Sequence, residues 1–97
     1  HVSQFNLIAR VDRFVDIAKA MGENVDGLSK RDAADLALES IRQLSKDVGI
    51  PSGLDELGVK EKDLKTMAEN AQKDACGLTN PRCPTLEDVI QIYKNAL

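Results

Sequence analysis

Apolar side chains recur every three or four residues along most of the chain, a spacing that predicts amphipathic α-helices. Two such stripes occupy the first half, and each stops at a glycine: Gly22 after the first and Gly49 after the second. Glycine suits the left-handed position that follows a helix, and Pro51 supports the second stop because it cannot continue a helix. The predicted inward residues are Phe14, Ile17, Ala18 and Met21, then Ala33, Leu36, Ala37, Ile41, Leu44 and Val48.

Two helix starts are marked by a hydroxyl residue with an acidic residue three positions later. Ser29 precedes Asp32, and Thr85 precedes Asp88. This is the pattern of a capping box, with Asp in place of the usual Glu. The two pairs therefore mark the starts of the second predicted helix and of the last one.

The second half of the chain is predicted to hold one short turn and two helices. Residues 54–59 read as a helical turn or 3₁₀ piece, and a helix runs from about Lys60 to Lys73, with Lys60 where a Ser or Thr cap is expected. The inward residues are Leu64, Met67, Ala68 and Ala71, then Leu86, Val89, Ile90, Tyr93 and Leu97 of the last helix. No segment alternates like a strand, so the predicted fold class is all-α, a compact bundle of four to five amphipathic helices.

Composition narrows the functional classes. A length of 97 residues suggests one domain with a modest core, which Leu, Ile, Val and Ala must fill because there is no Trp. The net charge of −3 and the pI near 5.1 give no reason to expect nucleic acid or an anionic membrane as a partner. No apolar run approaches the length of a membrane span and no signal peptide is visible, so we expect a cytoplasmic protein.

The first ten residues, HVSQFNLIAR, look helical from His1 onward, although no residue before His1 is present to cap that helix. We therefore expect residues 1–97 to be the C-terminal piece of a longer protein. The alternative is a complete domain that has been processed or cleaved from a tag.

The most irregular stretch is CGLTNPRCPT, residues 76–85, which holds both cysteines. Three interpretations are open: a metal knuckle, a disulfide clip, or a loop with two reduced thiols. A structural zinc site needs four ligands, and the chain offers Cys76, Cys83 and the distant His1. A cytoplasmic location disfavours a disulfide. No Ser-His-Asp or Cys-His arrangement and no phosphate-binding glycine loop is evident, so the residues alone give no complete active site.

Three stretches are similar to one family: HVSQFN, LSKDVGIPSGLDELGVKEKDL and DACGLTNPRCPTLEDVIQIY. The most specific pieces are the block from Val48 to Val59 and the D-x-C-x-x-x-NPR block from Asp74 to Arg82. From His1 to Leu97 the chain resembles the C-terminal helical domain of the iron-containing (group III) alcohol dehydrogenases, which are dehydroquinate-synthase-like and include lactaldehyde reductase and 1,3-propanediol dehydrogenase.

The resemblance implies a two-domain oxidoreductase that interconverts primary alcohols and aldehydes by hydride transfer. An N-terminal domain would bind NAD or NADP, and the helical domain would hold Fe²⁺ or Zn²⁺ through one Asp and three His. Those ligands fall upstream of His1, which matches a later, non-liganding histidine. Residues 1–97 would then be the C-terminal portion of the metal-carrying domain, without catalytic, metal or cofactor ligands, and inactive alone. Expected partners are the rest of the chain, the alcohol or aldehyde, and a second copy in a homodimer.

The resemblance also gives the irregular stretch a role. In relatives the segment that matches Asp74–Arg82 turns toward the cleft between the domains, which makes Cys76, Asn80 and Arg82 candidate residues of the substrate-pocket wall. The alternative is that Asn80 and Arg82 tie the loop to neighbouring helix ends. For the whole chain, the alternative function is a free-standing acidic helical interaction module without catalysis.

Overall fold

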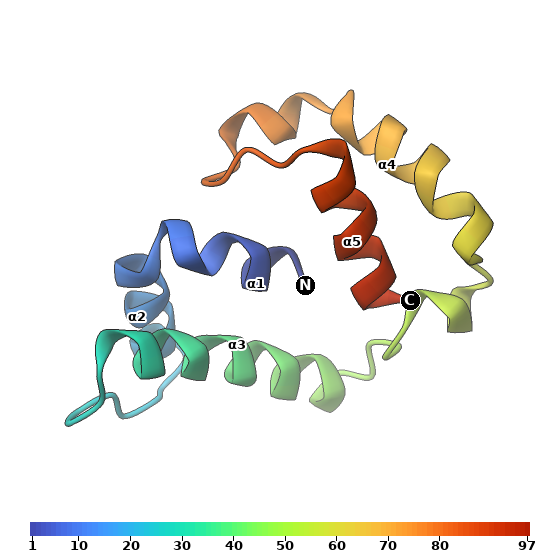
Figure 1. Cartoon of the computed structure of the whole chain (residues 1–97). Coiled ribbons are helices and arrows are strands. Elements are labelled where there is room, and N and C mark those ends of the chain that lie inside the picture. The colour runs from blue at the N-terminus through green and yellow to red at the C-terminus, as the bar shows by residue number, and fades with distance from the viewer. The chain divides into compact units, whose positions relative to one another are not determined.

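The computed structural model describes residues 1–97, and its fold is all-α, as predicted. Five α-helices and four 3₁₀ segments follow one another without a strand (Figure 1). No helix is both long and apolar enough to cross a membrane. The α-helices are α1 (Val2–Asn6), α2 (Val11–Ala20), α3 (Lys30–Asp47), α4 (Leu64–Gln72) and α5 (Leu86–Ala96). The 3₁₀ segments are η1 (Leu7–Ala9), η2 (Leu54–Leu57), η3 (Glu61–Asp63) and η4 (Ala75–Thr79).

The helices gather into two compact units, where the sequence predicted one bundle. The hairpin unit comprises residues 6–50, and the two-segment unit comprises residues 1–5 together with residues 51–97. The chain passes from one unit to the other between Phe5 and Asn6 and again between Ile50 and Pro51, shortly after the glycine that follows α3. Gly49 adopts φ +78°, a left-handed conformation that glycine reaches without strain.

The hairpin unit is built on the contact between α2 and α3 (Figure 1). Its core is small: alanines without exposed surface let the two helices approach closely, and Phe14 supplies the largest side chain. Ser29 caps α3 as predicted, because its hydroxyl oxygen accepts a hydrogen bond from the Asp32 amide at 3.1 Å. The core residues are Leu7, Phe14, Ala18, Ala34, Ala37 and Leu38.

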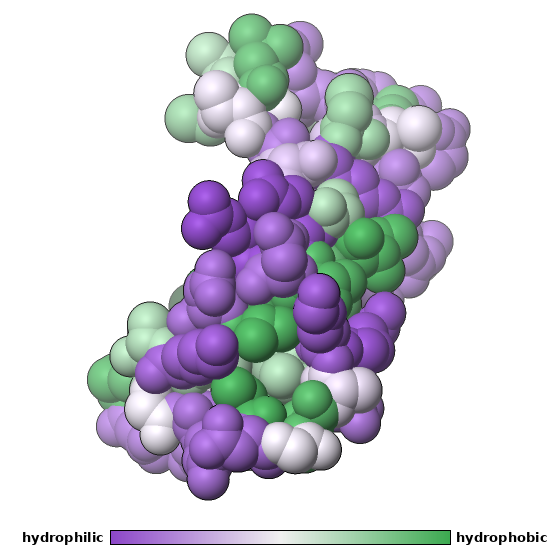
Figure 2. All heavy atoms as spheres, turned by 90° about the vertical axis from the view of Figure 1, so that its left-hand side faces the viewer, coloured by the Kyte–Doolittle hydropathy of each residue, from purple (hydrophilic) through white to green (hydrophobic).

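The predicted stripe of α3 is wrong over its second half. Leu44 is 52 % exposed and Val48 is 64 % exposed, whereas Ala34 and Leu38, which the stripe omitted, are buried. The reason is length: α2 has 10 residues and α3 has 18, so the last turns of α3 extend beyond their partner. Apolar residues also reach the surface among hydrophilic ones on the face seen in Figure 2.

In the two-segment unit, α4 packs beside α5 (Figure 1). Leu64, Ala68 and Val89 are buried there, as the sequence predicted. The capping box of α5 is present: the Thr85 hydroxyl oxygen accepts from the Asp88 amide at 3.1 Å, and the Asp88 carboxylate accepts from the Thr85 amide at 2.9 Å. These two bonds satisfy amide groups that the first turn of a helix leaves without partners.

The predicted helix at residues 60–73 begins with the 3₁₀ segment η3, and α4 follows from Leu64. Lys60 has no capping hydroxyl, but its backbone amide donates to the Asp63 carboxylate at 3.1 Å. The Asp63 amide in turn donates to the Lys60 carbonyl at 2.9 Å. The Lys60 carbonyl thus accepts from the amide that a Ser or Thr cap would serve, and the Asp63 carboxylate supplies the reciprocal half of a capping box.

Candidate functional site

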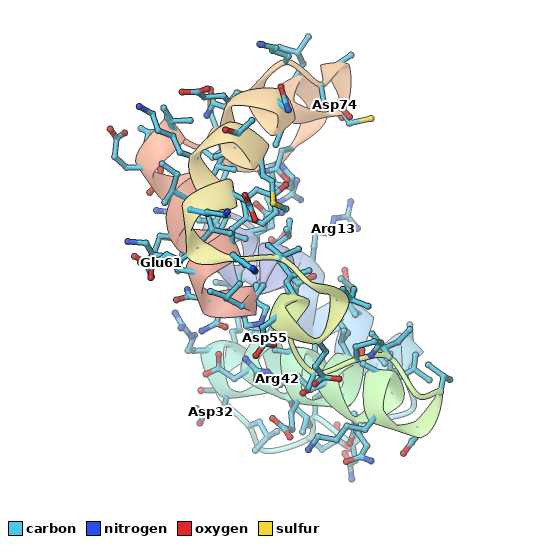
Figure 3. All side chains as sticks on the ribbon, turned by 90° about the vertical axis from the view of Figure 1, so that its right-hand side faces the viewer. Arg13, Asp32, Arg42, Asp55, Glu61 and Asp74 are labelled. Carbon is cyan, nitrogen blue, oxygen red and sulfur yellow. The ribbon has the colours of Figure 1, made fainter.

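The candidate site is the loop of residues 74–84, which connects α4 to α5 within the two-segment unit. Its first part is more regular than the sequence suggested, because residues 75–79 form η4. Asp74, at the start of this turn (Figure 3), accepts a hydrogen bond from the Cys76 amide at 2.8 Å. The Thr79 hydroxyl donates to the Cys76 carbonyl at 3.0 Å. Two side chains therefore fix the backbone on either side of Cys76.

The Asp74 carboxylate also sets the electrostatics of Cys76. Its hydrogen bond to the thiol and its negative charge raise the pKa of Cys76, while the Cys76 amide and thiol lower the pKa of Asp74. A thiol with a raised pKa stays protonated at neutral pH, and the protonated form is a poor nucleophile and a poor metal ligand. Cys76 and Cys83 are both exposed and free. Cys76 is therefore suited to contact a ligand as a neutral S–H group.

Arg82 faces the first helix of the chain. Its Nη1 donates to the Phe5 carbonyl oxygen at 3.0 Å, and its guanidinium carbon lies 3.9 Å from the centroid of the Phe5 ring. That distance is within the range of a cation–π contact. The Asn80 side-chain amide donates to the Arg82 carbonyl oxygen, and this bond closes the turn formed by residues 80–82.

Arg82 also contributes to the charge balance at the start of α5. The pKa of Asp88 is lowered, mainly by its hydrogen bonds with the Thr85 amide and hydroxyl and further by the positive charge of Arg82. A hollow of about 180 Å³ adjoins these residues. It is lined by His1, Gln4, Phe5, Arg82, Asp88, Gln91, Ile92 and Asn95.

A second hollow, of about 210 Å³, lies under the loop. Cys83 lines it, whereas Cys76 and Asn80 line neither of these two hollows. No local pattern in the sequence indicates that Cys83 lines this hollow. The loop is joined back to α4 here, because the Gln72 side-chain amide donates to the Pro84 carbonyl at 3.1 Å. The other lining residues are Ala71, Gln72, Asp74, Gly77, Leu78, Pro84 and Val89.

The side chains of residues 1–97 do not form a binding site for a divalent transition metal. No three of its His, Cys, Asp and Glu side chains are grouped so that they could hold an ion. His1 shares the first hollow with Asp88, whose carboxylate already serves the α5 cap. A transition-metal site in a protein needs at least three such ligands.

Comparison with known proteins identifies the family. Residues 1–97, the whole chain, match the model of the Fe-containing alcohol dehydrogenase family, C-terminal. The chain is 50 % identical over 97 residues to the NAD-dependent methanol dehydrogenase of Bacillus methanolicus, covering 100 % of this chain and 26 % of that protein. It is 50 % identical over 96 residues to the 1,3-propanediol dehydrogenase of Citrobacter freundii, covering 99 % of this chain and 25 % of that protein.

A solved structure supports the same assignment. A crystal structure of 1,3-propanediol oxidoreductase superposes with a TM-score of 0.98 at 47 % identity, over 100 % of this chain and 25 % of that one. The protein therefore belongs to the Fe-containing alcohol dehydrogenase family, and these residues are the family's C-terminal helical part. The resemblance noted in the sequence is confirmed. The chain spans about a quarter of the length of the relatives that it matches.

Proposed function

We propose that the full-length protein is an NAD- or NADP-dependent, iron-containing alcohol dehydrogenase that interconverts primary alcohols and aldehydes by hydride transfer. The observation that carries this proposal is the match of all 97 residues to the family, with 50 % identity to a dehydrogenase that uses NAD. Fe²⁺ or Zn²⁺ would supply Lewis-acid polarisation of the alcohol oxygen. Its ligands are expected upstream of His1, in a part of the metal-carrying domain outside residues 1–97.

The contribution proposed for this chain is a scaffold with one wall of the substrate pocket. The 74–84 loop is fixed at both ends, by Asp74 at η4 and by the Thr85 capping box at α5. A loop held by rigid helices can present a side chain to a ligand at a reproducible position. Cys76 would supply the contact, as a small, neutral and exposed group. Asn80 and Arg82 would complete the wall by holding the turn after η4.

The first test is activity itself. The full-length protein, loaded with Fe²⁺ or with Zn²⁺, is assayed for reduction of NAD⁺ and NADP⁺ with methanol, 1,3-propanediol and longer primary alcohols. We expect turnover with at least one alcohol and one metal. No turnover with any combination, in a protein shown to bind the metal, would contradict the proposal. The oligomeric state of the same preparation tests the homodimer that the resemblance implies. The cytoplasmic location stays a prediction.

The pocket wall is tested by Cys76→Leu in the full-length enzyme. A bulkier side chain should take volume from the alcohol site, so kcat/KM should fall more for long alcohols than for short ones. One methylene in an apolar pocket corresponds to roughly 1–3 kcal/mol, so discrimination of about tenfold or more is expected. Because Cys76 is exposed, metal content and the thermal midpoint should stay close to wild type.

Cys83→Leu is the matched control, since Cys83 is also an exposed thiol of this loop but lines the hollow beneath it. We expect Cys83→Leu to leave the chain-length preference unchanged. A lower midpoint with a flat preference in Cys76→Leu would show that Cys76 serves packing.

The alternative of a free-standing interaction module has the acidic charge of the chain and its amphipathic helices in its favour.

A further inference from the structure

We propose that Arg82 is a positioning residue. It anchors α1 against the 74–84 loop, and through α1 it also positions the segment of the full-length chain that precedes His1. The proposal rests on the proposed function, in which the metal-binding segment precedes His1. The observation that carries it is the double contact with Phe5, 77 positions away in sequence: one hydrogen bond to the Phe5 carbonyl and one cation–π contact with its ring.

α1 needs such an anchor because it is short. It spans 5 residues, from Val2 to Asn6, and isolated helices below about 12–15 residues are marginal in water. Residues 1–5 belong to the same compact unit as residues 51–97, yet no nearby chain connection joins them. Non-covalent contacts must therefore hold α1 in this unit. The Phe5 carbonyl is one of the last in α1, where carbonyls lack a partner within the helix.

Arg82 is itself held in place by residues of its own loop and of α5. The Asn80 amide donates to the Arg82 carbonyl, and Pro81 restricts the backbone directly before Arg82. The Asp88 carboxylate, in the first turn of α5, is attracted to the Arg82 guanidinium. Arg82 thus connects α5 and the loop on one side with α1 on the other.

The guanidinium chemistry is required, because one group makes both contacts at once. A planar guanidinium can stack on an aromatic ring and donate from its edge to a carbonyl in the same geometry. A lysine ammonium is a point charge and cannot do both equally well. This distinction separates a specific anchor from simple charge attraction.

In the full-length enzyme, loss of this anchor should displace the segment before His1 relative to the loop wall. Misplacement of reacting groups by about 1 Å can lower the rate by roughly 10²-fold. The chemical step should therefore slow more than substrate binding weakens. A residue that only stabilised the fold would lower the thermal midpoint without changing kcat below that midpoint.

The experiment compares Arg82→Gln, Arg82→Lys and Phe5→Leu in the metal-loaded, full-length protein. Hydrogen exchange of the backbone amides, followed in peptides that cover residues 1–9 and 86–97, measures how firmly α1 is held. The values of kcat and KM measure the effect of that anchoring on catalysis. For Arg82→Gln we expect exchange in residues 2–6 to rise about tenfold, the effect of one charge-assisted hydrogen bond. We expect kcat to fall at least as much, with KM changed little. Arg82→Lys and Phe5→Leu should each give part of both effects.

Arg31→Gln is the matched control, because it removes an exposed arginine that pairs with Asp35 on α3 in the hairpin unit. It should leave exchange in residues 2–6 and kcat unchanged. Unchanged exchange in Arg82→Gln would overturn the anchor, and raised exchange with unchanged kcat would overturn its role in positioning. If Arg82→Gln does not fold, Arg82→Lys and Phe5→Leu decide by the same criteria. A wild-type enzyme without alcohol oxidation would refute the proposed function instead, while the exchange data would still test the anchor.

Discussion

The two compact units are stabilised in different ways. The hairpin unit relies on a continuous apolar core, in which Ala18, Ala34 and Ala37 have no exposed surface. The two-segment unit buries fewer large side chains and depends on specific polar contacts, such as those of Arg82 with Phe5 and of Gln72 with Pro84. Apolar packing depends mainly on volume and tolerates substitutions that conserve it, whereas each polar contact requires one particular group. The candidate site lies in the second kind of region.

The polar contacts of the two-segment unit are what a loop with exposed side chains requires. A loop that must present side chains to a ligand cannot bury them, so other contacts must hold its shape. Cys76 and Leu78 are exposed, and Leu78 is 90 % exposed. The backbone beneath them is fixed by the Asp74 cap and by the Thr79 hydroxyl. The loop therefore combines exposed side chains with a defined backbone.

The largest effect is expected from the core of the hairpin unit. Phe14→Ala removes the largest buried side chain there and should destabilise this unit by about 3–5 kcal/mol, because a cavity remains. Hydrogen exchange of the α2 and α3 amides measures the free energy of local opening. Ile17→Ala on the same helix is the control, since Ile17 is 37 % exposed, and it should cost clearly less. Equal losses in the two variants would contradict an apolar core centred on Phe14.

In the two-segment unit, the sharpest steric requirement is at Gly53. A methyl group there would lie 2.6 Å from the Asp55 carboxylate oxygen Oδ1 and closer still to the Leu97 carbonyl oxygen. The Leu97 oxygen is a backbone atom, and it accepts a hydrogen bond from the Asp55 amide at 3.4 Å. The clash therefore cannot be relieved by a side-chain rotation alone. Gly53→Ala should therefore destabilise the protein by about 1–3 kcal/mol, as overpacking does.

Gly77→Ala is the control for Gly53→Ala. A methyl group at Gly77 would meet no atom within 4 Å, and Gly77 does not have a positive φ. This variant should be neutral, or stabilising by about 0.4–1 kcal/mol through the unfolded state. Thermal unfolding of the two variants side by side measures the difference. A destabilisation of similar size in both would indicate that glycine flexibility, and not the contact with Leu97, matters at position 53.

The parts of the fold that depend on local sequence could be predicted. Thr85 and Asp88 form the expected capping box, and Ser29 caps α3 through its hydroxyl bond to the Asp32 amide, because capping is decided within four residues. Burial along α3 could not be predicted beyond its first turns. Leu44 continues the apolar period of α3, but its exposure depends on where α2 ends, which no periodicity in α3 encodes.

The candidate site was predictable only in part. The resemblance singled out Cys76, Asn80 and Arg82, and their pocket role stays a prediction. The contact of Arg82 with Phe5 joins residues 77 positions apart, and the residue types give no signal for that pairing. Cys83 lines a hollow because the loop folds back on α4 through Gln72, which is again a non-local contact.

The smallest effect is expected from the charge of Asp74. Its carboxylate raises the pKa of Cys76 by accepting a hydrogen bond from the protonated thiol and, further, because a nearby negative charge disfavours the thiolate. Asp74→Asn keeps a side-chain oxygen that can accept from the Cys76 amide but removes the charge. The pKa of the thiol should then fall, so more thiolate is present at a given pH, and the pH profile of alkylation by iodoacetamide should shift to lower pH. A Cys83→Ser background leaves one reactive thiol, and Asp26→Asn in the hairpin unit is the control for loss of charge. An unshifted profile in Asp74→Asn would mean that the carboxylate shapes the turn without controlling the protonation of Cys76.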